Sequence, residues 1–550
     1  MSLWDQLIAR GSTGHGRLHA WSLDAGYRTC GWREVVDDAA CMGLALRRKG
    51  VGPGSVVASI LTNTALTVRG ILAVWMSGGT VASLPVMARG MSGDAYLLQL
   101  KTMCDKLDPG HLIVDESIIG LLPGEFRREL NASSWESLVT SGSVTPAPPA
   151  DTDVAFVQFS SGSTSEPKGC VLTPAAIEAQ IAIIAEMLGL ERGNGCAVSW
   201  LPLSHDMGLI GNLLAAWAWD LDLVLSPPER FMMQPRSWFD DVASFGATFT
   251  CGTNTGLGLA ASRQRGRPLS RQLELRTLIL GAERIERRVL DLALAVFGPF
   301  GLRPEALMPA YGMAEATLAV TATPQAEAPR WISVDAARLA GGDVIQVDAS
   351  AAQATTIVSA GRPCEGVELE GLEEDRLQTI VVRSPSLALG YVGDPDRSAA
   401  HFVRGAFQTG DLGFIHEGYL YPVGRTDDLI QIGGRNVYAC EVESAIDEIA
   451  GLRPGCSTLV GMHEPQPELV LLAELTADAA SPGELAALAA AAAMASAAVA
   501  LDRCLFLPRG TLPKTPSGKI QRYRCLRMLL EGTLEATADI PLGARAGDPA

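Results

Sequence analysis

The sequence has little of what proteins need to work on nucleic acids or in membranes. Acidic residues outnumber basic ones by 61 to 44, which gives a formal net charge of −17 at pH 7. A protein this acidic repels phosphate backbones and anionic lipid, so we expect no nucleic-acid partner and no membrane, although a local basic patch can still bind a small anion. The longest charge-free apolar run, Leu485–Leu501, is mostly alanine and short for a membrane span.

Signals of secretion and of disulfide bonding are also missing. The 11 cysteines are odd in number and scattered, and none form a CxxC pair, which favours reduced thiols over a disulfide framework or a zinc site. The N-terminal MSLWDQLIARGSTGH lacks the apolar segment of a signal peptide. We therefore expect a cytoplasmic protein. With 47% hydrophobic and 19% charged residues, the 550-residue chain can bury a large core and is neither mainly disordered nor fibrous.

Strand-like apolar runs alternate with segments of helical periodicity over most of the chain. Val57–Leu61 and Val154–Phe159 are typical of buried strands. Ala175–Leu188 carries apolar residues at helical spacing, with Thr173 placed to cap the helix and Gly189 placed to end it. This alternation predicts an α/β fold with much parallel sheet.

The pattern also indicates where the chain divides. Ala322–Ala360 is rich in loop-forming residues, and a new α/β pattern begins after the strand-like Tyr419–Val423. We expect a large N-terminal domain over residues 1–423 and a small C-terminal domain over residues 424–535. Residues 536–550 show no packing pattern and are expected to form a flexible tail.

The clearest chemical signal is SSGSTSEPKG, residues 160–169. It offers glycines, several hydroxyls and one lysine between a strand and a capped helix, which suits the binding of a polyphosphate. The spacing from glycine to lysine is wrong for a Walker loop, and a plain connecting loop is the alternative. The candidate phosphate-binding residues are Ser160, Ser161, Gly162, Ser163, Thr164 and Lys168.

This segment resembles the phosphate loop of the adenylate-forming superfamily, which includes acyl-CoA synthetases, peptide-synthetase adenylation domains and luciferases. Further segments resemble the other motifs of that family in the same order: WLPLSHDMGLIG (200–211), GAE (281–283), YGMAEAT (311–317), FQTGDLG (407–413), GRTDDLIQIGGRN (424–436) and LPKTPSGKIQR (512–522). Each motif alone has an ordinary structural explanation, but their joint order favours membership. The resemblance implies a multi-sheet N-terminal domain and a small, mobile α+β C-terminal domain.

The resemblance assigns a nucleotide-binding role to a set of residues along the chain. They are Gly281, Ala282, Glu283, Tyr311, Gly312, Met313, Thr317, Asp411 and Arg425. Tyr311 is expected to contact the adenine, and Thr317 or Ala316 to lie near the α-phosphate. Asp411, which we expect in a tight turn, and Arg425 are expected to hold the ribose.

The resemblance also implies catalytic residues. His205 is expected near the substrate carboxylate, and Glu315 is expected to bind Mg²⁺. Lys519, rather than Lys514, matches the lysine that bridges the carboxylate and the α-phosphate. Asp427 matches the hinge about which the small domain turns.

The implied reaction is attack of a carboxylic acid on ATP, which gives acyl-AMP and pyrophosphate. The acyl group then passes to coenzyme A or to a phosphopantetheine carrier protein, or the adenylate passes to a downstream enzyme. LSHDMGLIG and the stretch Ala322–Ala360 resemble the fatty acyl-AMP ligase branch, in which such an insertion is associated with restricted domain motion and poor use of coenzyme A. The alternative is a thioester-forming or binding homologue that does not itself adenylate.

Two segments depart from the family pattern. Ser165 replaces the second glycine that is usual in the phosphate loop. Val437–Cys440 differs from the residues that usually follow GRN. This second segment faces the thiol route in the family, so the departure concerns thioester formation more than adenylation.

Small side chains over Cys251–Ser262 predict a roomy acyl pocket, because relatives often carry aromatic residues there. The expected lining residues are Cys251, Gly252, Thr253 and Gly256. We expect a bulky or polycyclic acid, and the overall resemblance suggests natural-product enzymes such as the platensimycin-type diterpenoid acid activators. The same stretch imitates a dinucleotide fingerprint, but the following SRQRGRPLSRQ lacks a helical apolar face, which disfavours an NAD site.

Overall fold

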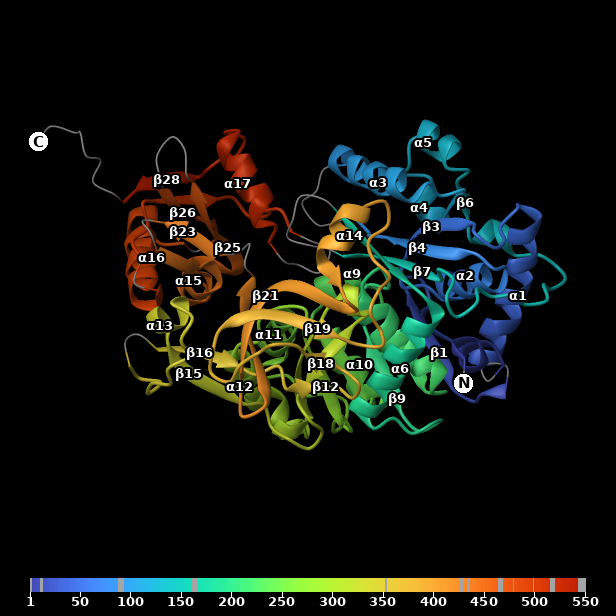
Figure 1. Cartoon of the computed structure of the whole chain (residues 1–550), viewed down its shortest axis with the longest axis horizontal. Coiled ribbons are helices and arrows are strands. Elements are labelled where there is room, and N and C mark those ends of the chain that lie inside the picture. The colour runs from blue at the N-terminus through green and yellow to red at the C-terminus, as the bar shows by residue number, and fades with distance from the viewer. Residues whose placement is uncertain are drawn as a thin grey trace, which may run out of the picture.

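The computed structural model describes residues 2–9, 13–87, 93–160, 167–351, 354–425, 429–432, 435–462, 468–477, 479–497, 499–514 and 520–542. Within these residues, helices cover two large sheets that are mainly parallel, which confirms the expected α/β class (Figure 1). None of the helices in this described part combines the length and the apolar character needed to cross a lipid bilayer.

The largest sheet has nine strands, and its centre is parallel and almost fully buried. Its order is β17 (Arg362–Pro363), β14 (Ala319–Ala322), β13 (Leu307–Gly312), β12 (Thr277–Leu280), β11 (Phe249–Gly252), β9 (Cys196–Ser199), β10 (Asp222–Leu225), β1 (Arg17–Ser22) and β2 (Gly26–Gly31). Every residue of β9, β11 and β12 is buried, as expected for parallel strands covered on both faces. Only the outer pairings at the two edges are antiparallel.

A second sheet has six strands, in the order β6 (Ser133–Ser134), β5 (His111–Val114), β3 (Val56–Ile60), β4 (Thr80–Leu84), β7 (Phe156–Ser160) and β8 (Lys168–Leu172). Strand β8 pairs antiparallel with β7 and lies between the predicted phosphate loop and the next helix. The strand–loop–helix arrangement expected from the sequence is therefore wrong. The loop joins two strands of a hairpin, because the short run Lys168–Leu172 extends the sheet before the helix begins.

Helices pack on the faces of these two sheets. They include α1 (Trp32–Arg48), α2 (Ala65–Met76), α3 (Gly93–Leu107), α4 (Glu116–Ile119), α5 (Gly124–Glu129), α6 (Pro174–Leu188), α9 (Pro228–Met233), α10 (Ser237–Phe245), α11 (Asn254–Gln264) and α12 (Arg287–Phe297). Helix α6 has the predicted ends, since the Thr173 hydroxyl accepts a hydrogen bond from the Ala176 amide at 3.1 Å and Gly189 is left-handed.

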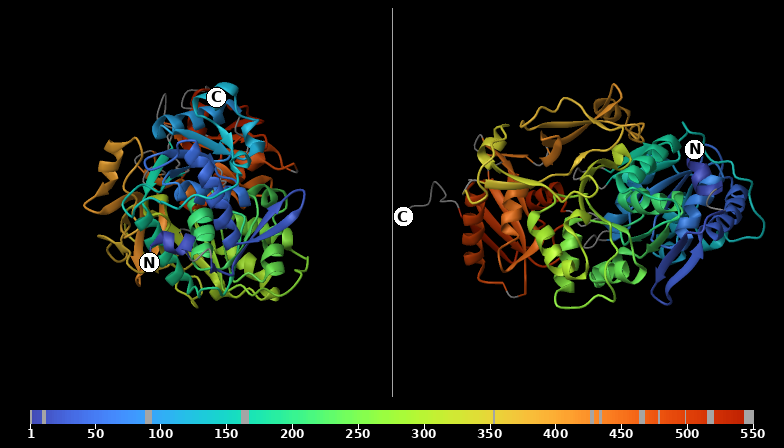
Figure 2. Two further views of the ribbon diagram at one scale, coloured as in Figure 1. Left: turned by 90° about the vertical axis from the view of Figure 1, so that its right-hand side faces the viewer. Right: turned by 90° about the horizontal axis from the view of Figure 1, so that it is seen from below.

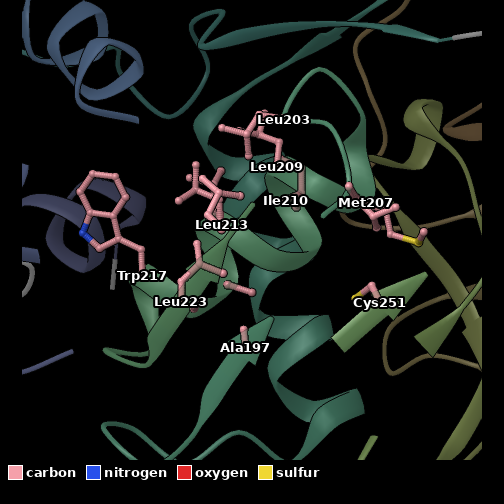
Figure 3. Close-up of a cluster of buried hydrophobic side chains, with 14 of the residues drawn as sticks. Ala197, Leu203, Met207, Leu209, Ile210, Leu213, Trp217, Leu223 and Cys251 are labelled. Atoms are coloured by element: carbon pink, nitrogen blue, oxygen red, sulfur yellow. The ribbon is translucent and has the colours of Figure 1, made fainter. Parts of the chain in front are cut away.

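A short, strongly apolar helical segment lies in the core between the helices and the nine-stranded sheet. It consists of α7 (Asp206–Gly208), the π-helix η4 (Leu209–Leu214) and α8 (Ala215–Ala218). Figure 3 shows this core, with Trp217 at one end and Met207 and Cys251 near each other at the other end. Helical bulges of this kind are often found at functional sites, and η4 is one wall of the cavity described below.

A third sheet contains β18 (Glu368–Leu369), β19 (Gln378–Arg383), β20 (Phe402–Val403), β21 (Ala406–His416) and β22 (Tyr419–Arg425), with α14 (Pro395–His401) beside it. The stretch Ala322–Ala360, which was expected to be loop-rich, packs against this sheet. It contains the paired strands β15 (Trp331–Asp335) and β16 (Ala354–Val358) and helix α13 (Ala336–Ala340). Four residues of this hairpin segment share a buried cluster with β21 and β22. The loop expectation was wrong there, because these apolar residues bury against a distant sheet.

Elements after β22 have a separate core at one end of the molecule (Figures 1 and 2). They are β23 (Leu429–Ile432), β24 (Arg435–Tyr438), α15 (Ala439–Ile446), β25 (Leu452–Met462), β26 (Glu468–Leu475), α16 (Pro482–Ala497), β27 (Arg503–Leu507), α17 (Arg522–Leu530) and β28 (Ala538–Pro541). The predicted boundary after residue 423 falls inside β22, two residues before that strand ends. The tail expected from residue 536 is corrected, because β28 pairs with β27; residues 543–550 lie outside the described residues.

Candidate active site

One cavity of about 580 Å³ lies where the large sheets meet the C-terminal elements. Its walls come from the carboxyl ends of β11, β12 and β13, from α6 and η4, from β21 and β22, and from α15 and β25. In open α/β sheets, ligands typically bind at the carboxyl ends of the strands. The cavity therefore lies where the sheet geometry favours a ligand, and most of the predicted site residues that the structure describes lie in its wall.

The predicted phosphate loop is described only at its two ends. Ser160 is the last residue of β7, and Lys168, which lines the cavity, is the first residue of β8. The two residues are paired across the hairpin. Ser161, Gly162, Ser163 and Thr164 lie outside the described residues, as does Ser165, so their phosphate-binding role stays a prediction.

Tyr311 and Asp411 meet in the cavity wall from two different sheets. The Tyr311 hydroxyl donates a hydrogen bond to Asp411 Oδ2 at 2.5 Å. Burial, together with the Asp411 carboxylate, raises the pKa of Tyr311 well above its usual value, so the phenol stays a donor. Next to it, Gly312 is required because a Cβ there would lie 2.0 Å from the Leu318 carbonyl oxygen. Met313 also lines the cavity.

Asp411 lies within strand β21, so the predicted tight turn is wrong. Gly410 has a φ of 74°, which gives the sequence a turn-like composition although the strand continues through it. Asp411 is paired with Arg425 of β22, and its Oδ1 lies 3.1 Å from Arg425 Nε. The strand pairing thus places both predicted ribose residues side by side in the cavity wall.

The turn after β12 forms another part of the wall. Gly281, Ala282 and Glu283 all line the cavity, as the sequence predicts. Ala282 has a φ of 67°, so the turn is held in a conformation that is uncommon for a residue with a side chain. The Glu283 carboxylate accepts a hydrogen bond from the Thr255 hydroxyl at 3.2 Å, which fixes the turn against the start of α11.

Glu315 lines the cavity as predicted, and it is paired with a residue that the sequence did not single out. The Tyr391 hydroxyl donates to Glu315 Oε1 at 2.8 Å. Lys168 Nζ lies 5.8 Å from the centre of the same tyrosine ring.

Thr317 does not lie where the sequence predicts. It is fully buried outside the cavity lining, and its hydroxyl donates a hydrogen bond to the Ser386 carbonyl at 2.6 Å. Ala316 is buried in the same way.

The wall around Glu315 fits a Mg²⁺ ion of the kind that the resemblance implies. Among the described residues, no three His, Cys, Asp or Glu side chains gather to form a metal cage. Mg²⁺ typically binds proteins through one or two carboxylates and completes its coordination with substrate phosphates and waters. An oriented Glu315 carboxylate in the same cavity wall as Lys168 suits that mode.

His205 and Asp206 form a pair at the start of α7, and both line the cavity. His205 Nδ1 lies 2.6 Å from Asp206 Oδ1, and Asp206 is buried. The imidazole keeps an exposed fraction of 23%. The carboxylate therefore fixes the ring orientation while the ring stays within reach of a ligand in the cavity.

The apolar part of the cavity lies between α6, η4 and the large sheet. Ile184, Met187, Ile279 and Leu318 line it. Gly211 of η4 also contributes, and a Cβ there would lie 3.0 Å from Leu318 Cδ2. This arm is lined by linear and branched aliphatic side chains, which suits an aliphatic ligand.

The four residues expected to form a roomy acyl pocket behave differently. Of these, only Cys251 lines the cavity, and burial raises the pKa of its thiol to about 12, so it stays protonated. A Cβ on Gly252 would lie 2.2 Å from the Trp238 ring, and one on Gly256 would lie 2.9 Å from the Trp200 ring. Thr253 caps α11 through a 3.0 Å hydrogen bond from the Gly256 amide. The small residues therefore make room for tryptophans rather than for substrate.

The C-terminal elements close the opposite side of the cavity. Glu443 accepts two hydrogen bonds of 2.9 Å from Arg522 Nη2, and both residues line the cavity. Asp447 accepts from the Gly455 amide at 2.9 Å and from the Ser457 hydroxyl at 3.1 Å. Burial raises the pKa of Asp447 to about 6. The predicted catalytic Lys519 and hinge Asp427 lie outside the described residues.

Arg284 connects three parts of the chain beside the cavity. Its Nη2 donates to the Thr356 carbonyl of the β15–β16 hairpin at 3.2 Å, and its Nη1 lies 3.5 Å from Cys440 Sγ of α15. It directly follows the cavity-lining Glu283. No local pattern predicts this role, because the contacts join segments that are far apart in the chain.

Comparison with known proteins agrees with this geometry. The sequence profile described as "AMP-binding enzyme" matches residues 12–392. The chain is 30% identical to the long-chain-fatty-acid–AMP ligase FadD32 of Mycolicibacterium smegmatis, over 74% of this chain and 72% of the relative. It is 29% identical to the medium-chain-fatty-acid–acyl-carrier-protein ligase JamA of Moorena producens, over 70% and 69%. A solved structure from a study of fatty acyl-adenylate ligases of E. coli and L. pneumophila has a TM-score of 0.89 at 24% identity, covering 97% of this chain and 98% of its own.

The fold, the cavity and the profile match together define an adenylate-forming ligase, an enzyme that uses ATP to activate a carboxylic acid as acyl-AMP. The chain belongs to the AMP-binding enzyme family. The family assignment drawn from the motifs of the sequence is thereby confirmed.

Proposed function

We propose that the chain is a fatty acyl-AMP ligase that passes its acyl group to a carrier protein. One observation carries this proposal: a single cavity joins an aliphatic arm to a polar arm with the groups that a nucleotide needs. Ile279 and Leu318 line the aliphatic arm, while Tyr311, Asp411 and Glu315 line the polar arm. The names of the two relatives reported above support a fatty acid as substrate and a carrier protein as acceptor.

In this mechanism the protein acts mainly by positioning and by neutralising charge. A carboxylate is a poor nucleophile toward a polyanion, so the attack on the α-phosphate needs both. The Tyr311 ring would support the adenine while Asp411 and Arg425 hold the ribose. Lys168 would place positive charge at the phosphates, and Mg²⁺ on Glu315 would supply further neutralisation when bound. His205, oriented by Asp206, would contact the substrate carboxylate.

The C-terminal elements from residue 424 would act as a lid that turns about Asp427 and supplies Lys519. Both residues lie outside the described part, so these roles rest on the motifs alone. Contacts across the cavity support a lid that closes on the large domain. Arg284 of the large domain contacts Cys440 of the lid. In addition, Arg288 of the large domain lies 3.8 Å from Glu448 of the lid.

The acceptor is inferred from the β15–β16 hairpin and from Cys440. Arg284 contacts both, so it couples the hairpin to the lid. A lid held in this way favours accumulation of the adenylate over direct transfer to coenzyme A, and a carrier protein is then the expected acceptor. Transfer to coenzyme A and hand-off to a downstream enzyme are the alternatives that experiment must separate.

We infer a linear acid as substrate rather than the polycyclic acid suggested by the sequence. Trp200 and Trp238 fill the space beside Gly256 and Gly252, so these glycines do not widen the acyl arm. The diterpenoid acid therefore stays a hypothesis without support from the cavity.

The cytoplasmic location also stays a prediction from the sequence.

Pyrophosphate release with a panel of acids tests the proposal. The panel contains linear fatty acids of medium and long chain and one terpenoid acid, each with and without coenzyme A or a phosphopantetheinylated carrier protein. We expect release with linear acids, acyl-AMP in the product mixture, and acyl transfer to the carrier protein. Efficient acyl-CoA formation would contradict the acceptor, and preference for the terpenoid acid would contradict the substrate. A complete lack of pyrophosphate release would favour the non-adenylating homologue.

A further inference from the structure

Tyr391 connects the two charged groups that the proposed reaction places around the phosphates. Its hydroxyl donates a 2.8 Å hydrogen bond to Glu315 Oε1. Its ring lies 5.8 Å from Lys168 Nζ, within the range of a cation–π interaction. The tyrosine itself does not line the cavity, whereas Glu315 and Lys168 do. It therefore supports both groups from behind.

The backbone around Tyr391 is fixed to β8, the strand that begins with Lys168. The Val171 amide donates to the Gly390 carbonyl at 3.0 Å, and the Val392 amide donates to the Gly169 carbonyl at 2.8 Å. The Tyr391 amide donates to the Ser398 hydroxyl at 2.8 Å. These bonds add residues 389–392 to the edge of the six-stranded sheet beside the predicted phosphate loop.

The side chain of Tyr391 is also tightly held. It is 6% exposed, and its ring packs edge-on against Phe402, with the centres 5.5 Å apart. The hydroxyl is thereby held in place as a donor to the Glu315 carboxylate.

We propose that Tyr391 is a positioning residue that holds the Glu315 carboxylate in the orientation needed to bind the divalent cation. This inference rests on the proposed adenylation at the same site. A hydrogen bond to Oε1 restricts the rotamer of the Glu315 side chain, and this would keep the carboxylate oriented for a divalent cation. Groups that orient a metal ligand in this way typically contribute a factor of about 10 to 100 in metal affinity or activity.

A simple structural role is the alternative, in which Tyr391 only fills space and satisfies a buried hydroxyl. Tyr419 is a matched control. It is 1% exposed, and its hydroxyl donates a 2.5 Å hydrogen bond to the Glu327 carboxylate, but neither residue lines the cavity. Both Tyr→Phe changes remove one part-buried phenol–carboxylate hydrogen bond, a kind of bond that contributes to stability. The two variants should therefore lose similar stability.

The experiment measures Mn²⁺ binding, used as a spectroscopic probe for Mg²⁺, to the full chain with an ATP analogue that cannot be cleaved at the α-phosphate. Free Mn²⁺ is followed by electron paramagnetic resonance for wild type, Tyr391→Phe, Tyr419→Phe, Glu315→Gln and the double variant Tyr391→Phe/Glu315→Gln. Thermal unfolding of each variant shows whether it is folded. We expect Tyr391→Phe to weaken Mn²⁺ binding about 10- to 100-fold, and Tyr419→Phe to leave it unchanged.

The double variant Tyr391→Phe/Glu315→Gln shows whether Tyr391 affects Mn²⁺ affinity through Glu315 or directly. When Glu315 is already replaced, loss of the Tyr391 hydroxyl should weaken Mn²⁺ binding no further, because residues that act through one another are not additive. Wild-type Mn²⁺ affinity in Tyr391→Phe, or an equal loss in Tyr419→Phe, would overturn the inference.

The same measurements distinguish this inference from the proposed function. If Tyr391→Phe weakens Mn²⁺ binding but wild type releases no pyrophosphate with any acid, the proposed function fails and the positioning role stands. If wild type adenylates acids while Tyr391→Phe binds Mn²⁺ normally, only the positioning role fails. Wild type that takes up no Mn²⁺ with the nucleotide overturns both.

Discussion

The Tyr311 hydroxyl lies 2.5 Å from Asp411 Oδ2, although the two residues are 100 positions apart in the chain. Tyr311 is the next-to-last residue of β13 in the nine-stranded sheet, and Asp411 belongs to the third sheet. The bond joins two sheets at the cavity, and it places the predicted adenine contact beside the predicted ribose contact. The two predicted nucleoside-binding residues therefore form one hydrogen-bonded unit.

Replacement Tyr311→Phe tests this unit. The ring that supports the adenine remains, but Asp411 loses the donor that orients it. We expect the KM for ATP to rise about tenfold with little change in kcat, which corresponds to the lower end of the roughly 1.5–3 kcal/mol typical of a hydrogen bond to a charged group. Pyrophosphate release at varied ATP gives both constants.

A matched control is Tyr27→Phe, because the Tyr27 hydroxyl donates to Asp241 at 2.6 Å far from the cavity lining. This variant should lose stability and keep the wild-type KM for ATP. An unchanged KM in Tyr311→Phe would show that the bond does not hold the ribose clamp.

Replacement Gly211→Leu tests the aliphatic arm. Even a Cβ at this position would lie 3.0 Å from Leu318 Cδ2, so a larger side chain must project into the arm. A methylene-sized change in an apolar pocket is worth about 1–3 kcal/mol. We expect kcat/KM for a long linear acid to fall about 10- to 100-fold, and that for a short acid to change far less.

The control for this change is Gly258→Leu on α11. Gly258 lies outside the cavity lining, and an added Cβ would meet Val289 at an ordinary contact distance of 3.7 Å. Its chain-length preference should match wild type. Equal losses for long and short acids in Gly211→Leu would place the acyl chain elsewhere.

Asp447 should make stability depend on pH. Burial raises its pKa from 3.8 to about 6, so the folded protein keeps a proton that the unfolded chain releases. Between about pH 4 and pH 6 the folded state therefore binds more protons, and its stability falls as the pH rises through this window. Above about pH 6, the ionised Asp447 carboxylate lowers the free energy of unfolding by of the order of 2 kcal/mol relative to pH 4, since one pKa unit is worth about 1.4 kcal/mol.

Thermal unfolding of wild type and Asp447→Asn across this range checks the expectation. The amide cannot ionise, so the variant should gain stability relative to wild type as the pH rises, and the gain should be complete near pH 7. A difference in Tm that stays constant from pH 4 to pH 7 would contradict the raised pKa.

Local signals in the sequence predicted local structure well. Thr173 and Gly189 mark the ends of α6 because capping and left-handed termination depend only on neighbouring residues. The sequence does not predict strand β8, because its apolar part is only the three residues Cys170–Leu172, which is too short to distinguish a strand from a connecting segment. Asp411 was placed in a turn because a Gly-Asp pair has the composition of one, while the pairing with β22 keeps it in a strand.

Features that depend on distant segments could not be predicted. Gly252 and Gly256 indicated free space, but Trp238 and Trp200 from other elements occupy it. Tyr391 was not among the predicted site residues, because its partner Glu315 lies 76 positions away and on a different element. Most of the nucleotide-binding residues that the family motifs predict, and that the structure describes, line the cavity, because the motifs were read as a set; Thr317, read in the same way, is buried behind the cavity wall.

The central claim is that this cavity joins a carboxylic acid to AMP with a lysine from the C-terminal elements. Acid-dependent exchange of pyrophosphate into ATP tests it most directly, in wild type, Lys519→Ala and Lys514→Ala. Lys514 is a matched control, because its Nζ donates to the Gly455 carbonyl at 2.6 Å and so has a structural partner within its own domain. We predict that exchange requires the acid, falls by orders of magnitude in Lys519→Ala and persists in Lys514→Ala. Exchange that is near normal in Lys519→Ala, or that needs no acid, would contradict the account.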